Sequence, residues 1–210
     1  MRRRFNDRVD AGRTLAAMLT HYADRSDVVV LGLARGGIPV AAPIAAALNA
    51  PLDVFVVRKI GAPGQPELAA GAIASGGTVV WNDDVIRAHG IGAWQLSRIT
   101  EAEQTELVRR EQVYRGEGTW RSLAGQTVIL VDDGLATGAS MRAAVRAVHR
   151  QGAGAIVVAV PTAPVGTDLG VDVDEFVCAA TPTPFRAVAS SYRSFPQTSD
   201  DEVRALLGRR

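Results

Sequence analysis

Short apolar runs alternate with segments of helical periodicity along most of the chain. Five of these runs are continuously apolar and rich in β-branched residues, and they lie at 28–33, 54–57, 128–131, 156–160 and 176–180. Strands that do not alternate apolar with polar residues are buried on both faces, as in a parallel sheet covered by helices. The pattern therefore predicts a doubly wound α/β fold with a mainly parallel five-stranded sheet flanked by helices.

Helices are expected in most of the intervals between the runs. Apolar residues recur at helical spacing at 10–24 and 140–151, and 37–49 is rich in alanine. Near the C-terminus, Ser199 and Glu202 have the spacing of a capping box ahead of another helix. Strand and helix thus follow each other as a doubly wound fold requires.

The middle of the chain interrupts this alternation. Two apolar segments, 68–75 and 78–82, flank Gly76 and Gly77, which is a hairpin signal. A strongly charged helix is expected next, at 93–115, with a thin apolar stripe typical of a solvated helix face. Alternatively, this helix forms a hood over a site or contacts another subunit of an oligomer. We therefore expect one domain, 1–210, with an insertion at about 61–120.

Composition narrows the class of protein. The 210 residues are 47% apolar and carry a net charge of +1, which gives no support for nucleic-acid binding by bulk electrostatics. No run reaches the roughly 18 apolar residues of a membrane span, and the basic start at residues 2–4 lacks the apolar segment of an export signal. A cytoplasmic protein that binds no membrane is expected, and a homo-oligomer stays possible.

The segment VILVDDGLATGAS, 128–140, combines two kinds of chemistry. The apolar run delivers Asp132 and Asp133 to the carboxyl edge of the sheet, where open α/β sheets bind ligands. Carboxylates there favour hydroxyl donors and hydrated Mg²⁺. The small loop that follows, with a helix starting near Ser140, is suited to a phosphate. A phosphorylated ribose carries both hydroxyl groups and a phosphate, so it matches this segment.

Two other strand ends carry candidate cations. Ala34, Arg35, Gly36 and Gly37 form a tight loop whose backbone can approach a ligand, with Arg35 as a fork-shaped phosphate donor. Arg58 and Lys59 are expected to end the second strand, beside a Gly/Pro-rich loop that could close over a ligand. Lys59 is the only lysine of the chain, which indicates a need for a compact ammonium there.

The segment 128–140 resembles the phosphoribosyl-pyrophosphate signature of type I phosphoribosyltransferases. The resemblance implies that Asp132 and Asp133 hold the ribose hydroxyls. It also implies that the loop holds the 5′-phosphate, through Ala136, Thr137, Gly138, Ala139 and Ser140. One departure from the signature is Gly134, where an aliphatic residue is usual and where glycine is expected to loosen the loop.

Other segments extend the resemblance. The loop at 34–37 is similar to the pyrophosphate-binding loop of this family, which often holds a strained peptide bond. Segments at 5–16, 64–73 and 185–203 look like a bacterial group of phosphoribosyltransferases that occur alone or fused to hydrolase domains. At Ala136, members acting on 6-oxopurines typically carry aspartate, so alanine looks more like the adenine or uracil branches.

The function that the resemblance implies is a Mg²⁺-dependent glycosyl transfer in nucleotide salvage. Phosphoribosyl pyrophosphate would donate its sugar to a nitrogenous acceptor, with Arg35, Lys59, Asp132 and Asp133 as catalytic residues. Substrate contacts would come from Ala34, Gly36, Gly37, Arg58 and 136–140. Mg²⁺ would be held mainly through the substrate, with Asp132 and Asp133 as the carboxylates within reach.

Two other functions stay open at this point. The same fold can serve as a non-catalytic protein that binds phosphoribosyl pyrophosphate and regulates a partner. A weaker alternative is a phosphatase acting on a nucleotide or sugar phosphate through Asp132 and Asp133, which would need more metal-binding carboxylates than the motif supplies. The sequence does not identify the acceptor.

Overall fold

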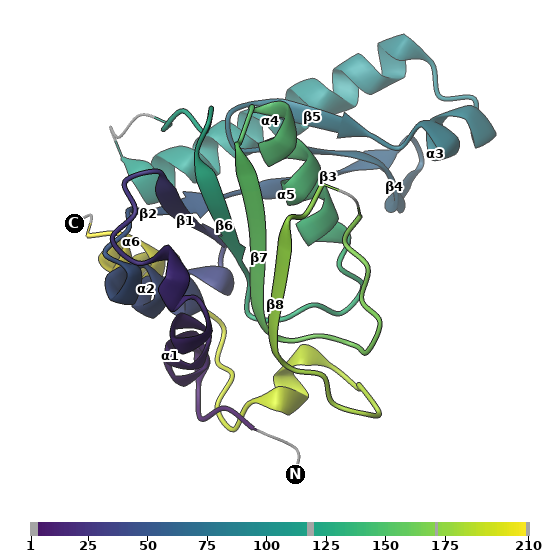
Figure 1. Ribbon diagram of the computed structural model, residues 1–210. Coiled ribbons are helices and arrows are strands. Elements are labelled where there is room, and N and C mark those ends of the chain that lie inside the picture. The colour runs from purple at the N-terminus through teal and green to yellow at the C-terminus, as the bar shows by residue number, and fades with distance from the viewer. Residues whose placement is uncertain (1–3, 117–119, 171, 209–210) are drawn as a thin grey trace.

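The computed structural model describes residues 4–116, 120–170 and 172–208, and its central element is a five-stranded parallel sheet (Figure 1). Its strands are β1 (Val28–Leu33), β2 (Leu52–Phe55), β6 (Thr127–Val131), β7 (Ala155–Thr162) and β8 (Glu175–Ala180). They lie in the order β2-β1-β6-β7-β8. The predicted fold class is confirmed. Four of the five apolar runs lie wholly within strands of this sheet, while the run at 54–57 is divided between β2 and the next strand along the chain.

Helices cover both faces of the sheet, as a doubly wound fold requires. On one face, α1 (Arg8–Met18) and α2 (Gly37–Leu48) bury Leu15 and Ile44 against alternate strand residues such as Val30 and Ile129. On the other face, α5 (Ala139–Arg150) buries Met141 and Val145 against Val29 and Leu130. The chain thus crosses from one face to the other between β1 and β6.

The insertion forms a second, antiparallel sheet, and it begins earlier than expected. Its strands are β3 (Val57–Ala62), β4 (Gln65–Ala74) and β5 (Thr78–Trp81), in that order. The helices α3 (Asp83–Ala88) and α4 (Ala93–Arg115) follow. The predicted hairpin is present as β4–β5. The expectation that Arg58 and Lys59 end the second strand is wrong, because β2 stops at Phe55 and both residues belong to β3.

A buried arginine at the end of α4 attaches the insertion to the main sheet. Arg115 donates from Nε to both carboxylate oxygens of Asp53 at 3.2 Å and from Nη2 to the Val54 carbonyl at 2.5 Å. Its Nη1 lies 2.7 Å from Glu111 Oε1, and its guanidinium stacks over the Trp120 ring. Leu107 of α4 is buried with Ile60 and Ile73 of the second sheet, so the predicted charged helix is solvated on its outer face and packed on its inner one.

The N-terminal segment packs against the segment around Tyr192 over the carboxyl edge of the sheet. Phe5 forms a bridge to Tyr192, and Tyr192 stacks against Phe195. The C-terminal segment also contains η2 (Val188–Ser191) and α6 (Asp200–Leu206), where Ser199 caps α6 as predicted. Helix α1 starts and stops earlier than the expected 10–24, because Asp7 caps it and a separate turn, η1 (Thr20–Tyr22), follows Leu19.

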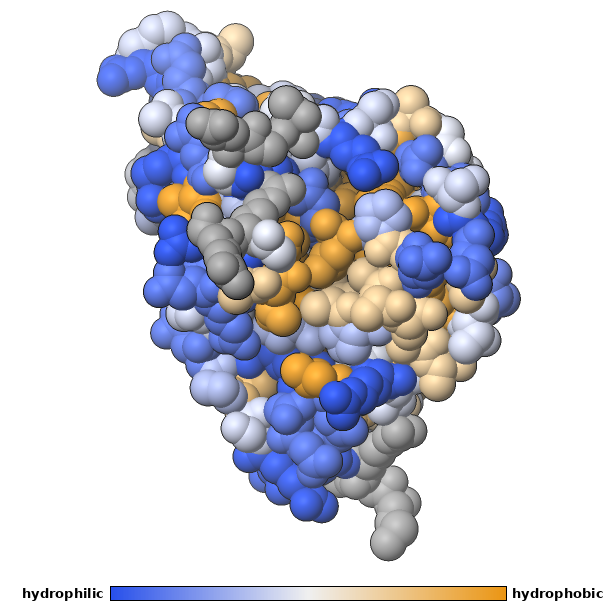
Figure 2. Space-filling view, turned by 90° about the vertical axis from the view of Figure 1, so that its left-hand side faces the viewer, coloured by the Kyte–Doolittle hydropathy of each residue, from blue (hydrophilic) through white to orange (hydrophobic). Residues whose placement is uncertain are grey.

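Two surface properties complete the fold. No described helix is both long enough and apolar enough to cross a bilayer. On the side of the molecule that carries α2 and α6, apolar residues gather around a shallow groove (Figure 2). Its lining is mostly alanine and other small apolar side chains: Ala42, Ala45, Ala46, Asn49, Ala50, Pro51, Leu52 and Leu206. Of the basic start, residues 2 and 3 lie outside the described residues.

Candidate functional site

The loops after β1 and β6 meet at the carboxyl edge of the main sheet. Because α2 follows β1 on one face and α5 follows β6 on the other, these loops flank the point where the strand order reverses. Open α/β sheets bind ligands in the crevice at such a point. The acid pair and the small loop of 132–138 therefore lie where a ligand is expected.

The acid pair is held by hydrogen bonds that leave an oxygen of each carboxylate available. Asp132 Oδ1 accepts from the Asp133 backbone N–H at 2.8 Å, and Asp133 Oδ2 accepts from Arg8. Within the described part of the chain, Asp132 Oδ2 and Asp133 Oδ1 accept from no donor. These two oxygens are thus able to accept hydrogen bonds from a ligand that carries neighbouring hydroxyl groups.

Electrostatics also prepare the pair for a ligand. Burial, with the adjacent Asp133 carboxylate as the second cause, raises the pKa of Asp132 to about 8. Burial raises the pKa of Asp133 as well, and the Arg8 guanidinium opposes that shift. Hydroxyl donors or a nearby cation would favour the charged form of both groups. Ligand binding and ionisation of this pair are therefore linked.

The loop that follows the acids is open to solvent. Its exposed residues include Ala136, Thr137, Ala139 and Ser140, and Gly138 adopts a positive φ of 72° as the N-cap of α5. Backbone N–H groups in the first turn of a helix have no intrahelical acceptor, and the helix dipole makes this end positive. In the described residues, the N–H groups of Thr137, Gly138 and Ser140 donate to no protein acceptor. The arrangement can take a phosphate.

Residue 36 must be glycine because the loop at 34–37 lies against the acid pair at the end of β6. A Cβ at Gly36 would lie 2.1 Å from Asp133 Oδ2, and a Cβ at Gly37 would lie 2.5 Å from the Val131 carbonyl oxygen. The loop at 34–37 thus passes directly over the acid pair, and only its backbone fits there. The Ala34–Arg35 peptide bond in this loop is cis.

Gly134 is required by packing, which corrects the expectation that it loosens the loop. A Cβ at this position would meet Val188 at 2.6 Å and Thr162 at 2.8 Å. Its φ of 155° is also unfavourable for residues with a side chain. The departure from the usual aliphatic residue therefore accompanies the close approach of the C-terminal segment to the loop.

The side chain of Arg35 points away from the acid pair. Its Nη1 lies 3.6 Å from Asp200 Oδ1, and it lines a small pocket with Arg109, Arg110 and Tyr114. The structure thus brings the backbone of the loop to the site, while the guanidinium lies between α4 and α6.

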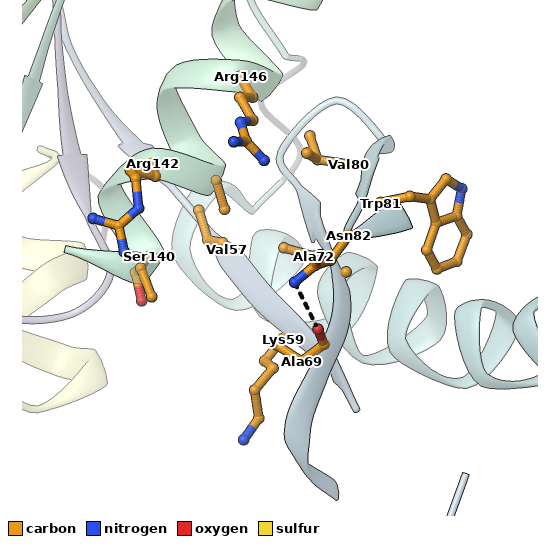
Figure 3. Close-up of a pocket in the computed structure, with 13 residues that line it drawn as sticks. Val57, Lys59, Ala69, Ala72, Val80, Trp81, Asn82, Ser140, Arg142 and Arg146 are labelled. Carbon is orange, nitrogen blue, oxygen red and sulfur yellow. Dashed lines mark hydrogen bonds between the residues drawn. The ribbon is translucent and has the colours of Figure 1, made fainter. Parts of the chain in front are cut away.

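Arg58 and Lys59 face opposite sides of the second sheet. Arg58 donates to Glu103 of α4 at 2.6 Å and lies 3.7 Å from Glu106, so its guanidinium is engaged away from the acid pair. Lys59 lines a cavity together with Ser140 of α5 (Figure 3). Its Nζ donates to Glu67 Oε2 at 3.0 Å, and this carboxylate is 96% exposed. Lys59 thus shares a cavity with Ala139 and Ser140 at the start of α5.

Two residues of the site were not singled out from the sequence, although both lie in segments that carry the family resemblance. Arg8 reaches Asp133 from the first turn of α1, which Asp7 caps by accepting from the Asp10 N–H at 2.8 Å. Tyr192 donates its hydroxyl to the Asp133 carbonyl at 2.6 Å, and burial raises the pKa of this hydroxyl. Arg8 and Tyr192 are both distant from Asp133 along the chain, and no local pattern identifies them.

The comparisons with known proteins agree with this geometry. A family model for the phosphoribosyl transferase domain matches residues 4–178. The chain belongs to the phosphoribosyl transferase family. It is similar to a protein of known crystal structure from Thermus thermophilus, with 39% identity, a TM-score of 0.82 and coverage of 97% of each chain.

A relative in Mycobacterium tuberculosis, named as a candidate phosphoribosyl transferase, is 47% identical over 207 residues. The match covers 98% of this chain and 46% of that protein, so the chain spans about half of the length of this relative. The phosphoribosyl transferase domain is therefore shared nearly from end to end, while the relative contains further residues.

Proposed function

We propose that this phosphoribosyl transferase domain transfers the 5-phosphoribosyl group from phosphoribosyl pyrophosphate to a nitrogenous acceptor, with release of pyrophosphate. The observation that carries the proposal is the position of Asp132 and Asp133 directly beside the open loop 136–140, at the reversal of strand order. A sugar with two hydroxyls and a 5′-phosphate matches the acids at one end and the helix N-terminus at the other.

In this proposal, different residues bind different groups of the donor sugar. Asp132 and Asp133 accept hydrogen bonds from the ribose hydroxyls through their available oxygens. The amides of 136–140, with the hydroxyls of Thr137 and Ser140, hold the 5′-phosphate. The loop at 34–37 brings backbone close to the leaving group. Lys59 adds positive charge from the second sheet.

The reaction forms a bond from an acceptor nitrogen to C1 of the ribose while the bond from C1 to the pyrophosphate oxygen breaks. The electron pair of the broken bond leaves with pyrophosphate, so positive groups near the departing oxygens stabilise the transition state. Lys59 supplies such a charge.

Mg²⁺ fits the donor set at this site. It binds through one or two carboxylates together with substrate phosphates and keeps several waters. Asp132 and Asp133 provide carboxylate oxygens, and no group of three or more His, Cys, Asp or Glu gathers among the described residues. When bound, Mg²⁺ would neutralise the charge that develops on pyrophosphate. The phosphatase alternative lacks the larger ligand set that it needs within this part of the chain.

Release of pyrophosphate tests the proposal. The protein is incubated with phosphoribosyl pyrophosphate, Mg²⁺ and a panel of purine and pyrimidine bases, and pyrophosphate is measured by a coupled assay. We expect release that depends on one acceptor and is lost in the Asp132→Asn, Asp133→Asn double variant. Release that is equal in the double variant would contradict the assignment. An acceptor that is a free nucleobase would place the reaction in nucleotide salvage.

A regulatory role is the second candidate, and the engaged cations favour it. Arg35 pairs with Asp200 and Arg58 pairs with Glu103, so two of the three candidate cations have acidic partners away from the acid pair. Binding of the sugar without turnover on any base would support this role. Turnover in which Lys59→Gln lowers kcat but not sugar affinity would support the enzyme.

A further inference from the structure

The cavity that Lys59 shares with Ser140 extends between α5 and the β3–β5 sheet, beside the crevice of the acid pair (Figure 3). Its volume is about 350 Å³, within the range of small-ligand pockets. Its walls contain three basic side chains and no acidic one. The lining residues are Val57, Lys59, Ala69, Gly71, Ala72, Val80, Trp81, Asn82, Ala139, Ser140, Arg142, Ala143 and Arg146. Asp132 and Asp133 do not line it, so it is not the crevice of the acid pair.

The three cations come from two opposing elements. Lys59 projects from β3, while Arg142 and Arg146 lie one turn apart on α5 (Figure 3). Like charges at this i,i+4 spacing repel each other and weaken a helix. The pair is therefore costly for α5 in the absence of an anion.

These cations have few protein partners. Arg142 Nη1 donates to the Asp168 carbonyl at 3.4 Å, which is a long contact. Arg146 has no acceptor or carboxylate partner among the described residues. Lys59 pairs only with Glu67 within the same part of the chain, and that side chain is 96% exposed. The positive charge of the cavity is thus largely uncompensated, and an anionic ligand can supply the missing partner.

The rest of the lining is small and apolar. Val57, Ala69, Ala72 and Ala143 leave space between the two walls. The ring of Trp81 is turned away from the cations (Figure 3). Small apolar lining residues leave room for a compact or flat group, while the three basic side chains favour a negatively charged ligand.

We propose that this cavity is a binding site for a diphosphate group, carried either by free pyrophosphate or by a nucleoside diphosphate. Two linked phosphates present oxygens toward both walls, so α5 and β3 can be contacted together, whereas a single phosphate engages one wall. The inference does not depend on the proposed transfer reaction. Lys59, Ala139 and Ser140 are shared with the proposed sugar site, so the test relies on Arg142 and Arg146.

Calorimetric titration separates the two sites. Pyrophosphate, ADP, AMP and inorganic phosphate are each titrated into the wild type, an Arg142→Gln, Arg146→Gln variant and an Asp132→Asn, Asp133→Asn variant. The control is Arg13→Gln, which removes an exposed arginine of α1 that lines no part of the cavity. Far-UV circular dichroism establishes that each variant is folded.

We expect pyrophosphate or ADP to bind the wild type more tightly than AMP or phosphate. The double arginine variant should bind about tenfold or more weakly, as expected when charge-assisted hydrogen bonds are lost. The Arg13 and aspartate variants should bind like the wild type. Tighter binding of ADP than of pyrophosphate would identify a nucleotide as the source, and the reverse order would identify free pyrophosphate.

Three results would overturn the inference. They are an absence of diphosphate binding, equal affinity in the double arginine variant, and equal affinity for AMP and ADP. If the aspartate variant alone lost diphosphate binding, the ligand would belong to the sugar site instead, which would also overturn it. These binding measurements do not require turnover, so a protein that fails to catalyse the transfer reaction can still give each of these results.

Discussion

Arg8 and Asp133, 125 positions apart in the chain, form a two-point contact at the centre of the site. Nε and Nη2 of Arg8 donate to the same oxygen of Asp133, Oδ2, at 2.9 and 2.7 Å. Nη1 donates to the Pro196 carbonyl at 2.6 Å, and the guanidinium stacks on the Phe195 ring. Arg8 therefore orients Asp133 and leaves Oδ1 for a ligand.

Replacement of Arg8 by Met should weaken both the fold and the binding of the sugar. The side chains of Arg8 and Asp133 are 10% and 17% exposed, so removal of the cation leaves a nearly buried carboxylate unpaired. Such losses cost about 3–5 kcal/mol. Urea unfolding and calorimetry with phosphoribosyl pyrophosphate measure the two effects. Arg13→Met is the control, and equal stability of the two variants would contradict the importance of the pair.

Asp132→Asn should stabilise the free protein while it removes sugar binding. The pKa of Asp132 is raised from 3.8 to about 8, so between these pH values the folded chain binds more protons than the unfolded chain. The free energy of unfolding must then fall as pH rises through this window.

The asparagine variant lacks this proton, so its stability should depend less on pH and its Tm at pH 8 should exceed that of the wild type. Each kcal/mol gained raises Tm by about 2–4 °C in a chain of this size. Calorimetric scans from about pH 5 to pH 9 span the window in which the carboxyl group titrates. A variant that is less stable than the wild type at pH 8 would argue against an unfavourable burial of the charged Asp132 carboxylate.

Gly36→Ala should abolish sugar binding because the new methyl group would overlap Asp133. Its Cβ would lie 2.1 Å from Oδ2, so the loop at 34–37 or the carboxylate must move. The matched control is Gly92→Ala, where the nearest atom to the new Cβ is 3.7 Å away and φ is −74°. Calorimetry should detect sugar binding only in the control, and retained affinity in Gly36→Ala would show that the two loops are not packed as described.

Arg115→Met should destabilise the protein through the insertion rather than through the site. The side chain is 3% exposed, and its loss leaves Asp53 without its guanidinium partner in the interior. We expect a loss of about 3–5 kcal/mol in urea unfolding. Sugar affinity at a temperature well below the Tm should stay close to the wild-type value. Loss of affinity without loss of stability would place Arg115 in the site instead of in the scaffold.

The main sheet was predictable because its strands are buried on both faces and read as continuous apolar runs. Strand β3 was not, since Val57 ends the second apolar run and Arg58 and Lys59 look like the polar end of the same strand. The chain turns there into another sheet. β3 pairs with β4, with shifts in register near Gly61. This pairing depends on tertiary packing, which the local Gly/Pro-rich sequence does not predict.

The sequence predicted the part of the candidate site whose residues are adjacent in the chain. It did not predict the part that folding brings together from distant positions. Asp132 and Asp133 lie next to the phosphate loop in the sequence, so one strand end delivers both features. Arg8 and Tyr192 join them only when the N-terminal segment and the segment around Tyr192 fold over the carboxyl edge of the sheet. The direction of Arg35 depends likewise on Asp200, which is remote in sequence.

The most direct test of the central claim is calorimetric binding of phosphoribosyl pyrophosphate in the presence of Mg²⁺. The wild type is compared with the Asp132→Asn, Asp133→Asn variant and with Gly92→Ala. If the acid pair and the loop 136–140 hold the sugar, the wild type and Gly92→Ala bind it and the double variant binds at least about a hundredfold more weakly, the loss of two charged acceptors. Equal binding by all three proteins would contradict the account.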